Sequence, residues 1–181
     1  MIRTRVGYAG GEKENPTYER IGDHSETIQI DYDPEQITYA ELLDVYWTSH
    51  SPTSRPFSRQ YASVIFYHDQ EQRRLAEESR DRREAELGKP VYTEIVPYAE
   101  FYLAEGYHQK YQLRHDRDLM AEFRAIYPDE ADFINSTAAA RVNGYVAGNG
   151  TLEELQAIVK DLGLSTEAQQ RLLDRLSLRS R

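Results

Sequence analysis

The stretch ETIQIDYDPEQITYAELLDVYW, residues 26–47, decides the fold because it contains a strand followed by a helix. Ile28 and Ile30 alternate with polar residues, which is typical of a strand with one apolar face. Thr38 and Glu41 then form the Thr-x-x-Glu sequence of a capping box, which predicts the start of a helix. This order of elements indicates an α/β domain.

Similar signals organise the rest of the chain. Further strands are expected at 2–6, 61–67 and 91–96, and further helices at 70–86, 152–162 and 167–178. Asp69 is expected to cap the helix at 70–86, and Thr151 with Glu154 repeats the capping box before the helix at 152–162. The segment 61–67 is apolar on both faces, which favours a central strand covered on two sides. We expect an α/β domain over residues 1–115 and a helical C-terminal extension over residues 116–181 that packs on the same domain.

The composition narrows the possible functions. A formal net charge of −9 argues against a general nucleic-acid binder, since phosphate binding needs clustered Lys and Arg. The apolar runs are too short to cross a bilayer, and no basic segment followed by an apolar one opens the chain, so we expect no membrane association and a cytoplasmic location. The 181 residues include no cysteine, which excludes disulfides, thiolate metal sites and a cysteine nucleophile within this chain.

Three further patterns are weak candidates for a site. Glu105 and His108 have a spacing that binds iron when two copies face each other, but only one copy is present, so no metal is expected. His50, at a helix end, is expected to cap backbone carbonyls. The Gly10-Gly11 pair has none of the residues that surround a phosphate-binding loop.

An ordered set of short motifs is similar to the A-type peptide methionine sulfoxide reductases. The motifs are Val6-Gly7-Tyr8-Ala9-Gly10-Gly11, Asn15-Pro16-Thr17-Tyr18, His24-Ser25-Glu26, Asp33-Pro34, His50-Ser51-Pro52-Thr53, Gln60-Tyr61, Ser63-Val64-Ile65-Phe66-Tyr67, Phe101-Tyr102, Ala104-Glu105 and Tyr107-His108-Gln109-Lys110-Tyr111. They follow the order of the family and cover residues 2–111.

The chain also departs from the family pattern. The family carries its nucleophile in a Gly-Cys-Phe-Trp element on the first strand and helix, and Met1 falls after that element. The loop between His50 and Tyr61 is shorter than usual, and no resolving cysteine follows. The resemblance therefore implies a ferredoxin-like two-layer sandwich with a mixed sheet that lacks its first strand and helix, and we expect an N-terminally truncated member.

The resemblance also implies a chemistry and its residues. The family reduces the S-epimer of methionine sulfoxide, free or in proteins: a thiolate attacks sulfur, and the resulting sulfenic acid is reduced by thioredoxin or another thiol. Glu26 matches the proton donor, and Tyr18 and Tyr61 match the tyrosines that hold the sulfoxide oxygen. No other cofactor is implied, and we expect a monomer.

Strand alternation supports the acid role of Glu26. It lies on the side of Ile28 and Ile30, so it should point toward the core, where a carboxyl group favours its neutral form. The alternative is that Glu26 precedes the strand and points into solvent, which is the usual environment of Glu.

Three interpretations of the whole chain follow. The first is a reductase by family that is inactive in this cysteine-free form. The second is a non-catalytic module that binds oxidised methionine, or a scaffold. The third is an incomplete fold whose exposed sheet edge promotes self-association.

Overall fold

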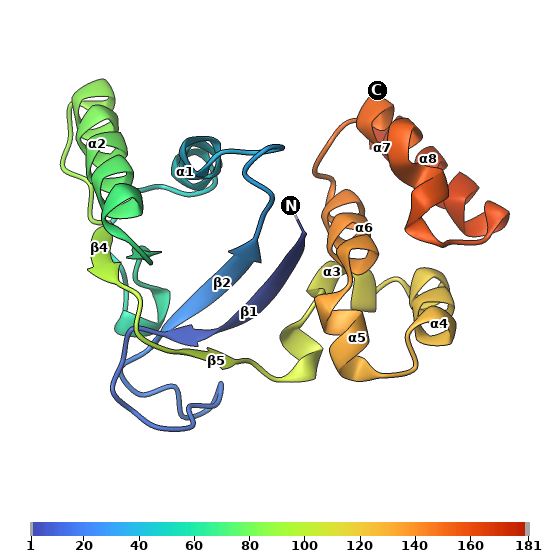
Figure 1. Ribbon diagram of the computed structural model, residues 1–181, viewed down its shortest axis with the longest axis horizontal. Helices are drawn as coiled ribbons and strands as arrows, with labels where there is room; N and C mark the ends of the chain where they lie inside the picture. The colour runs from blue at the N-terminus through green and yellow to red at the C-terminus, as the bar shows by residue number, and fades with distance from the viewer. Residues whose placement is uncertain (1, 180–181) are drawn as a thin grey trace. The chain divides into compact units, whose positions relative to one another are not determined.

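The computed structural model describes residues 2–179 as two compact units, both shown in Figure 1. The first contains Val6–Ala104, and the second contains residues 2–5 together with the chain from Glu105 onward. Strands and helices are both present, which confirms the α/β class. The packing of residues 116–181 on the first 115 residues stays a prediction.

The strands form two separate sheets. In the first, β1 (Arg3–Ala9) lies between β2 (Ser25–Asp31) and β5 (Phe101–Leu103), as Figure 1 shows. β1 and β5 are antiparallel. In the second sheet, β3 (Val64–Tyr67) and β4 (Glu94–Pro97) run parallel. The mixed strand directions agree with the expected class, but the ferredoxin-like arrangement is not confirmed.

The approach of β5 to β1 depends on a glycine. A Cβ atom added to Gly7 would lie 2.2 Å from the carbonyl oxygen of Tyr102, a distance that no side chain tolerates. Glycine at this position therefore allows the two backbones to come together.

Three strand predictions need correction: the strand expected at 91–96 begins only at Glu94 and includes Pro97. The first strand continues to Ala9, because Tyr8 and Ala9 are buried. The predicted central strand at 61–67 is wrong: Tyr61 ends the 3₁₀ helix η1 (Arg59–Tyr61), and in the part of the chain that the structure describes β3 pairs only with β4. Apolar side chains on both faces of β3 indicate that these faces are covered. They do not show that both edges of the strand are paired.

The two helices of the first unit begin where their capping residues predict. α1 (Tyr39–Thr48) has the complete capping box of Thr38 and Glu41. α2 (Gln70–Leu87) is capped by the Asp69 side chain and ends at Gly88, whose φ of +60° favours glycine. The core between these helices and β3 is small: its buried members are Leu43, Trp47, Ile65 and Ala76.

The second unit is helical and has its own core. Its elements are η2 (Gly106–His108), α3 (Tyr111–Arg114), α4 (Arg117–Ile126), α5 (Glu130–Asn135), α6 (Thr137–Ala147), α7 (Leu152–Ile158), η3 (Val159–Leu162) and α8 (Thr166–Arg179). Phe123, Val142, Leu155 and Leu172 are buried in one cluster, supplied by α4, α6, α7 and α8. The expected capping box of Thr151 at the start of α7 is confirmed.

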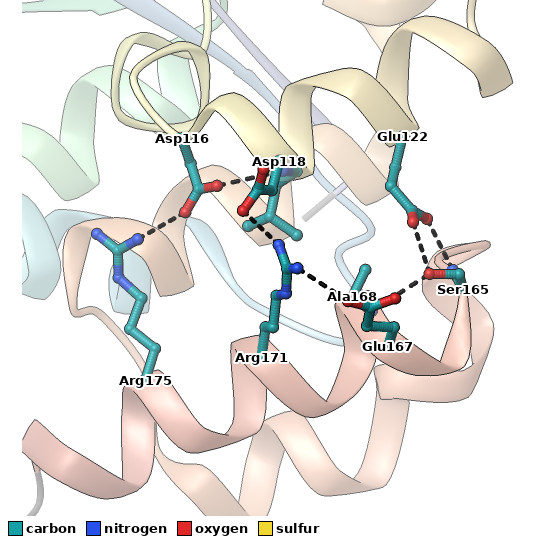
Figure 2. Close-up of polar contacts among 9 residues, drawn as sticks. Asp116, Asp118, Glu122, Ser165, Glu167, Ala168, Arg171 and Arg175 are labelled. Atoms are coloured by element: carbon teal, nitrogen blue, oxygen red, sulfur yellow. Dashed lines mark hydrogen bonds and ion pairs between the residues drawn. The ribbon is translucent and has the colours of Figure 1, made fainter.

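Polar contacts join α4 to α8, as Figure 2 shows. Arg171 contacts Asp118 of α4 and, at 2.9 Å, Glu167 of its own helix. The Glu122 carboxylate accepts hydrogen bonds from the hydroxyl and the backbone N–H of Ser165, at 2.5 and 2.8 Å. Hydrogen bonds from Ser165 lower the pKa of Glu122 below its usual 4.5.

A buried hydrogen bond in the first unit gives a stability prediction. Trp47 Nε1 donates to Ser79 Oγ at 2.9 Å, and both side chains are buried. We expect Ser79→Ala to lower the free energy of unfolding by about 1–3 kcal/mol, because the indole N–H loses its acceptor. Urea unfolding followed by the fluorescence of the single tryptophan measures this, with the exposed Thr48→Ala as control. Equal midpoints for the two variants would contradict the prediction.

The Glu122–Ser165 contact predicts a pH dependence of stability. Because the folded pKa of Glu122 is lowered, its contribution is present above the unfolded value of 4.5 and is lost as the pH falls through the folded value. We expect the free energy of unfolding to fall less between pH 5 and pH 3 in Glu122→Gln than in the parent chain. The control is Glu153→Gln, at an exposed position of α7. Parallel pH profiles for parent and Glu122→Gln would refute the assignment.

Candidate functional site

Tyr18, Glu26 and Tyr61 come from three segments of the first unit. Tyr18 lies in the turn closed by the bridge between Thr17 and Arg20, Glu26 is the second residue of β2, and Tyr61 ends η1. Glu26 and Tyr61 lie on adjacent elements, since Gln60 Nε2 donates to Glu26 Oε1 at 2.7 Å.

The two tyrosines and the carboxylate interact with one another. The pKa of Tyr61 is raised, first by the charge of Tyr18, then by desolvation, by the charge of Glu26 and by a hydrogen bond with the Tyr18 side chain. The Tyr61 hydroxyl is protonated at neutral pH, as tyrosine ordinarily is, and it can donate a hydrogen bond to an oxygen. The structure thus brings the three predicted side chains together; their roles stay predictions.

The three side chains are open to solvent. Tyr18 is 42% exposed and Tyr61 is 53% exposed. Glu26 is also exposed, which corrects the expectation that it points into the core. It lies on the side of Ile28 as alternation requires, but Ile28 is itself 57% exposed and lines an open cavity of about 470 Å³.

A buried histidine holds the loop that carries Tyr18. His24 is 1% exposed, and its Nδ1 accepts the N–H of Gly11 at 3.1 Å while its Nε2 donates to the carbonyl of Lys13 at 2.7 Å. The neighbouring Asp23 accepts the N–H groups of Glu12 and Lys13, and these bonds lower its pKa. The loop is therefore closed onto the start of β2 by two consecutive side chains.

The element that carries Tyr61 is fixed to the same strand. Ser25 Oγ donates to the carbonyl of Arg59 at 2.8 Å. Arg59 Nη1 in turn donates to both carboxylate oxygens of Glu94, at 2.7 and 2.8 Å. These contacts hold η1, and with it Tyr61, against the start of β2.

Sequence reasoning missed the roles of His24, Arg59 and Gln60. His24 and Gln60 stand in motifs that also contain Glu26 and Tyr61, and that adjacency was the available signal. Arg59 had no such signal, because its partner Glu94 is far away in the sequence.

The structure also shows where His50, Glu105 and His108 lie. His50 Nδ1 donates to the carbonyl of Tyr46 at 2.9 Å, which confirms its role at a helix end. Glu105 and His108 lie at η2, and residues 2–179 contain no group of three acidic or histidine side chains placed to hold a metal ion. Within the same residues, no helix has the length and apolar character needed to span a membrane.

Comparison with known proteins identifies the family. Residues 1–141 match the family described as peptide methionine sulfoxide reductase. A peptide methionine sulfoxide reductase of Drosophila melanogaster is 41% identical over 172 residues, which cover 94% of this chain and 69% of that protein. Another from Methanothermobacter thermautotrophicus is 45% identical over 129 residues, covering 65% of this chain and 76% of that protein.

Relatives and a solved structure extend this result. The relative A5 from Oryza sativa is 39% identical over 153 residues, 81% of this chain, and the match spans only 59% of that protein. The crystal structure of reduced Mxr1 from Saccharomyces cerevisiae has a TM-score of 0.59 and 29% identity, covering 63% of this chain and 71% of that one. The chain therefore belongs to the peptide methionine sulfoxide reductases, a family of oxidoreductases.

Proposed function

We propose that this chain carries the oxygen-recognising half of a peptide-methionine (S)-S-oxide reductase. The observation that supports the proposal is the grouping of Tyr18, Tyr61 and Glu26 on one open surface: the two tyrosine side chains share a hydrogen bond, and Gln60, next to Tyr61, donates to Glu26. The substrate is methionine-S-sulfoxide, free or in a protein. Because the site is exposed, it accepts the oxidised methionine side chain of a large protein substrate.

The residues have distinct roles in this proposal. The two tyrosine hydroxyls donate hydrogen bonds to the sulfoxide oxygen, whose negative charge grows as the sulfur–oxygen bond breaks. Glu26 in its acid form transfers a proton to that oxygen. Gln60, which donates to Glu26 at 2.7 Å, orients the carboxyl group.

The attack on sulfur needs a group from outside this chain. A thiolate must form a bond to sulfur and become a sulfenic acid, and the 181 residues contain no cysteine. Turnover therefore requires a thiol from outside these 181 residues, and a thioredoxin-like protein is the proposed reductant. A cytoplasmic location and a monomeric state stay predictions.

The absence of cysteine also favours a second candidate function. Glu26 and the tyrosines without a nucleophile suit a module that binds oxidised methionine and releases it unchanged. The two functions share the same surface and differ only in whether a thiol reaches the bound sulfur.

One prediction of the proposed function concerns turnover. With N-acetyl-methionine-S-sulfoxide and dithiothreitol, we expect the chain to produce N-acetyl-methionine no faster than dithiothreitol alone, because it has no cysteine. Chromatography of the product measures the rate, and heat-denatured protein is the control. Reduction well above this background would show that a small thiol attacks the bound sulfoxide directly, and would contradict the requirement for a cysteine-bearing polypeptide.

Another prediction of the proposed function concerns binding of the sulfoxide. We expect Tyr61→Phe and Glu26→Gln each to weaken binding of N-acetyl-methionine-S-sulfoxide by about 2- to 10-fold, the effect of one lost hydrogen bond. An NMR titration measures the dissociation constants, with the R-epimer as ligand control. Tyr107→Phe is the matched control variant, because Tyr107 is 58% exposed and belongs to the second unit. If all three variants bind alike, the surface does not recognise the sulfoxide.

A further inference from the structure

The helical second unit contains two Asn-Gly pairs, Asn143-Gly144 and Asn149-Gly150. Both lie beyond residues 1–141, the part of the chain that matches the family. Asparagine is a thermolabile residue, and it is most reactive before glycine, where no Cβ atom obstructs attack by the glycine nitrogen on the side-chain amide. Because both pairs have this reactive sequence, the structure decides which of them reacts.

The first pair is held inside α6. Asn143 is half-buried, and its Oδ1 accepts the backbone N–H of Leu113 at 3.1 Å. Gly144 lies within the helix, where each backbone N–H is bonded to the carbonyl four residues earlier. A reaction at this pair requires both hydrogen bonds to break and a turn of α6 to open. The fold therefore protects Asn143.

The second pair lies in the turn that connects α6 to α7 (Figure 1). Gly148 ends α6 with a φ of +93°, and Gly150 has a φ of +79°, so a glycine in the left-handed region stands on each side of Asn149. Asn149 and Gly150 are both exposed. Within residues 2–179, neither the side-chain amide of Asn149 nor the N–H of Gly150 makes a hydrogen bond. Both reacting groups are therefore free and in contact with water.

We propose that Asn149 is a site of spontaneous deamidation. The Gly150 nitrogen forms a bond to Cγ of Asn149, and the side-chain nitrogen leaves as ammonia, which carries away the proton of the Gly150 N–H. Water then opens the resulting succinimide at either of its carbonyl groups and gives aspartate or isoaspartate. No electrons are transferred, and water is the only co-reactant. Each product adds a negative charge to this turn.

The isoaspartate product changes the main chain, because the chain then runs through the former side chain and gains a carbon atom. The turn has little space for it: a Cβ atom on Gly150 would lie 2.7 Å from Cε1 of Tyr145. The next residue, Thr151, begins the capping box of α7, in which the Glu154 N–H donates to Thr151 Oγ1 at 3.1 Å. We expect the longer chain to displace this cap, so that the Glu154 N–H exchanges faster with solvent.

The test ages the folded chain at mildly alkaline and at mildly acidic pH and locates deamidation by peptide mass spectrometry. In the alkaline sample we expect at least about tenfold more deamidation at Asn149 than at Asn143, because Asn143 reacts only after local opening of α6. The acidic sample should react more slowly, since the attacking nitrogen must lose its proton. In urea the two sites should react at similar rates, because the protecting helix is lost.

Two variants separate the effects. Asn149→Gln should abolish the signal at this position and leave that of Asn143 unchanged, since the longer side chain closes its ring slowly. Asn149→Asp carries the charge without the extra carbon, so it should keep the parent's hydrogen exchange at Glu154, whereas the isoaspartate form should not. Circular dichroism checks that both variants fold.

Two results would overturn the proposal. One is equal deamidation of Asn143 and Asn149 in the folded chain. The other is an unreacted Asn149 in the folded chain over a period in which the chain in urea reacts. Unchanged exchange of the Glu154 N–H in the isoaspartate form would refute the displacement of the α7 cap.

Discussion

The buried imidazole of His24 is the contact on which the candidate site depends. Its two nitrogens hold the backbone at Gly11 and Lys13, so the loop that carries Tyr18 is folded back onto β2. Leaving such buried groups without partners costs about 1–3 kcal/mol each. Ser25, the next residue, binds the carbonyl of Arg59 and so places η1 against the same strand. One short segment therefore brings together side chains that are distant in the sequence.

The two units differ in how completely they bury their apolar surface. The helical unit encloses Phe123, Leu155 and Leu172 in a continuous core. The first unit has a smaller core around Trp47 and leaves Ile28 exposed beside the cavity. Strands satisfy their backbone groups only through neighbours, whereas helices satisfy theirs internally. This explains why the unpaired strand edges of the described residues occur in the first unit.

Sulfoxide reduction combines two tasks, protonation of oxygen and attack on sulfur. In the proposed function this chain supplies groups for the first task only, because hydroxyl and carboxyl groups suit an oxygen and no cysteine is present for the sulfur. The open arrangement of Tyr61 and Glu26 fits a surface that is completed by the substrate or by residues outside this sequence. Covering by a partner would also provide the apolar surroundings that an acid catalyst needs.

The sequence alone determined the family, the class of the fold and the starts of α1, α2 and α7. The capping residues Thr38 and Thr151 identified helix starts because their partners lie only three residues away. Only the tertiary structure decided that the strand at 64–67 has a free edge and that Glu26 is exposed. The alternation of side chains predicts which face of a strand a residue occupies. Whether that face is buried depends on elements that are distant in the sequence. For the same reason, the contact between Tyr18 and Tyr61 became visible only in the folded chain.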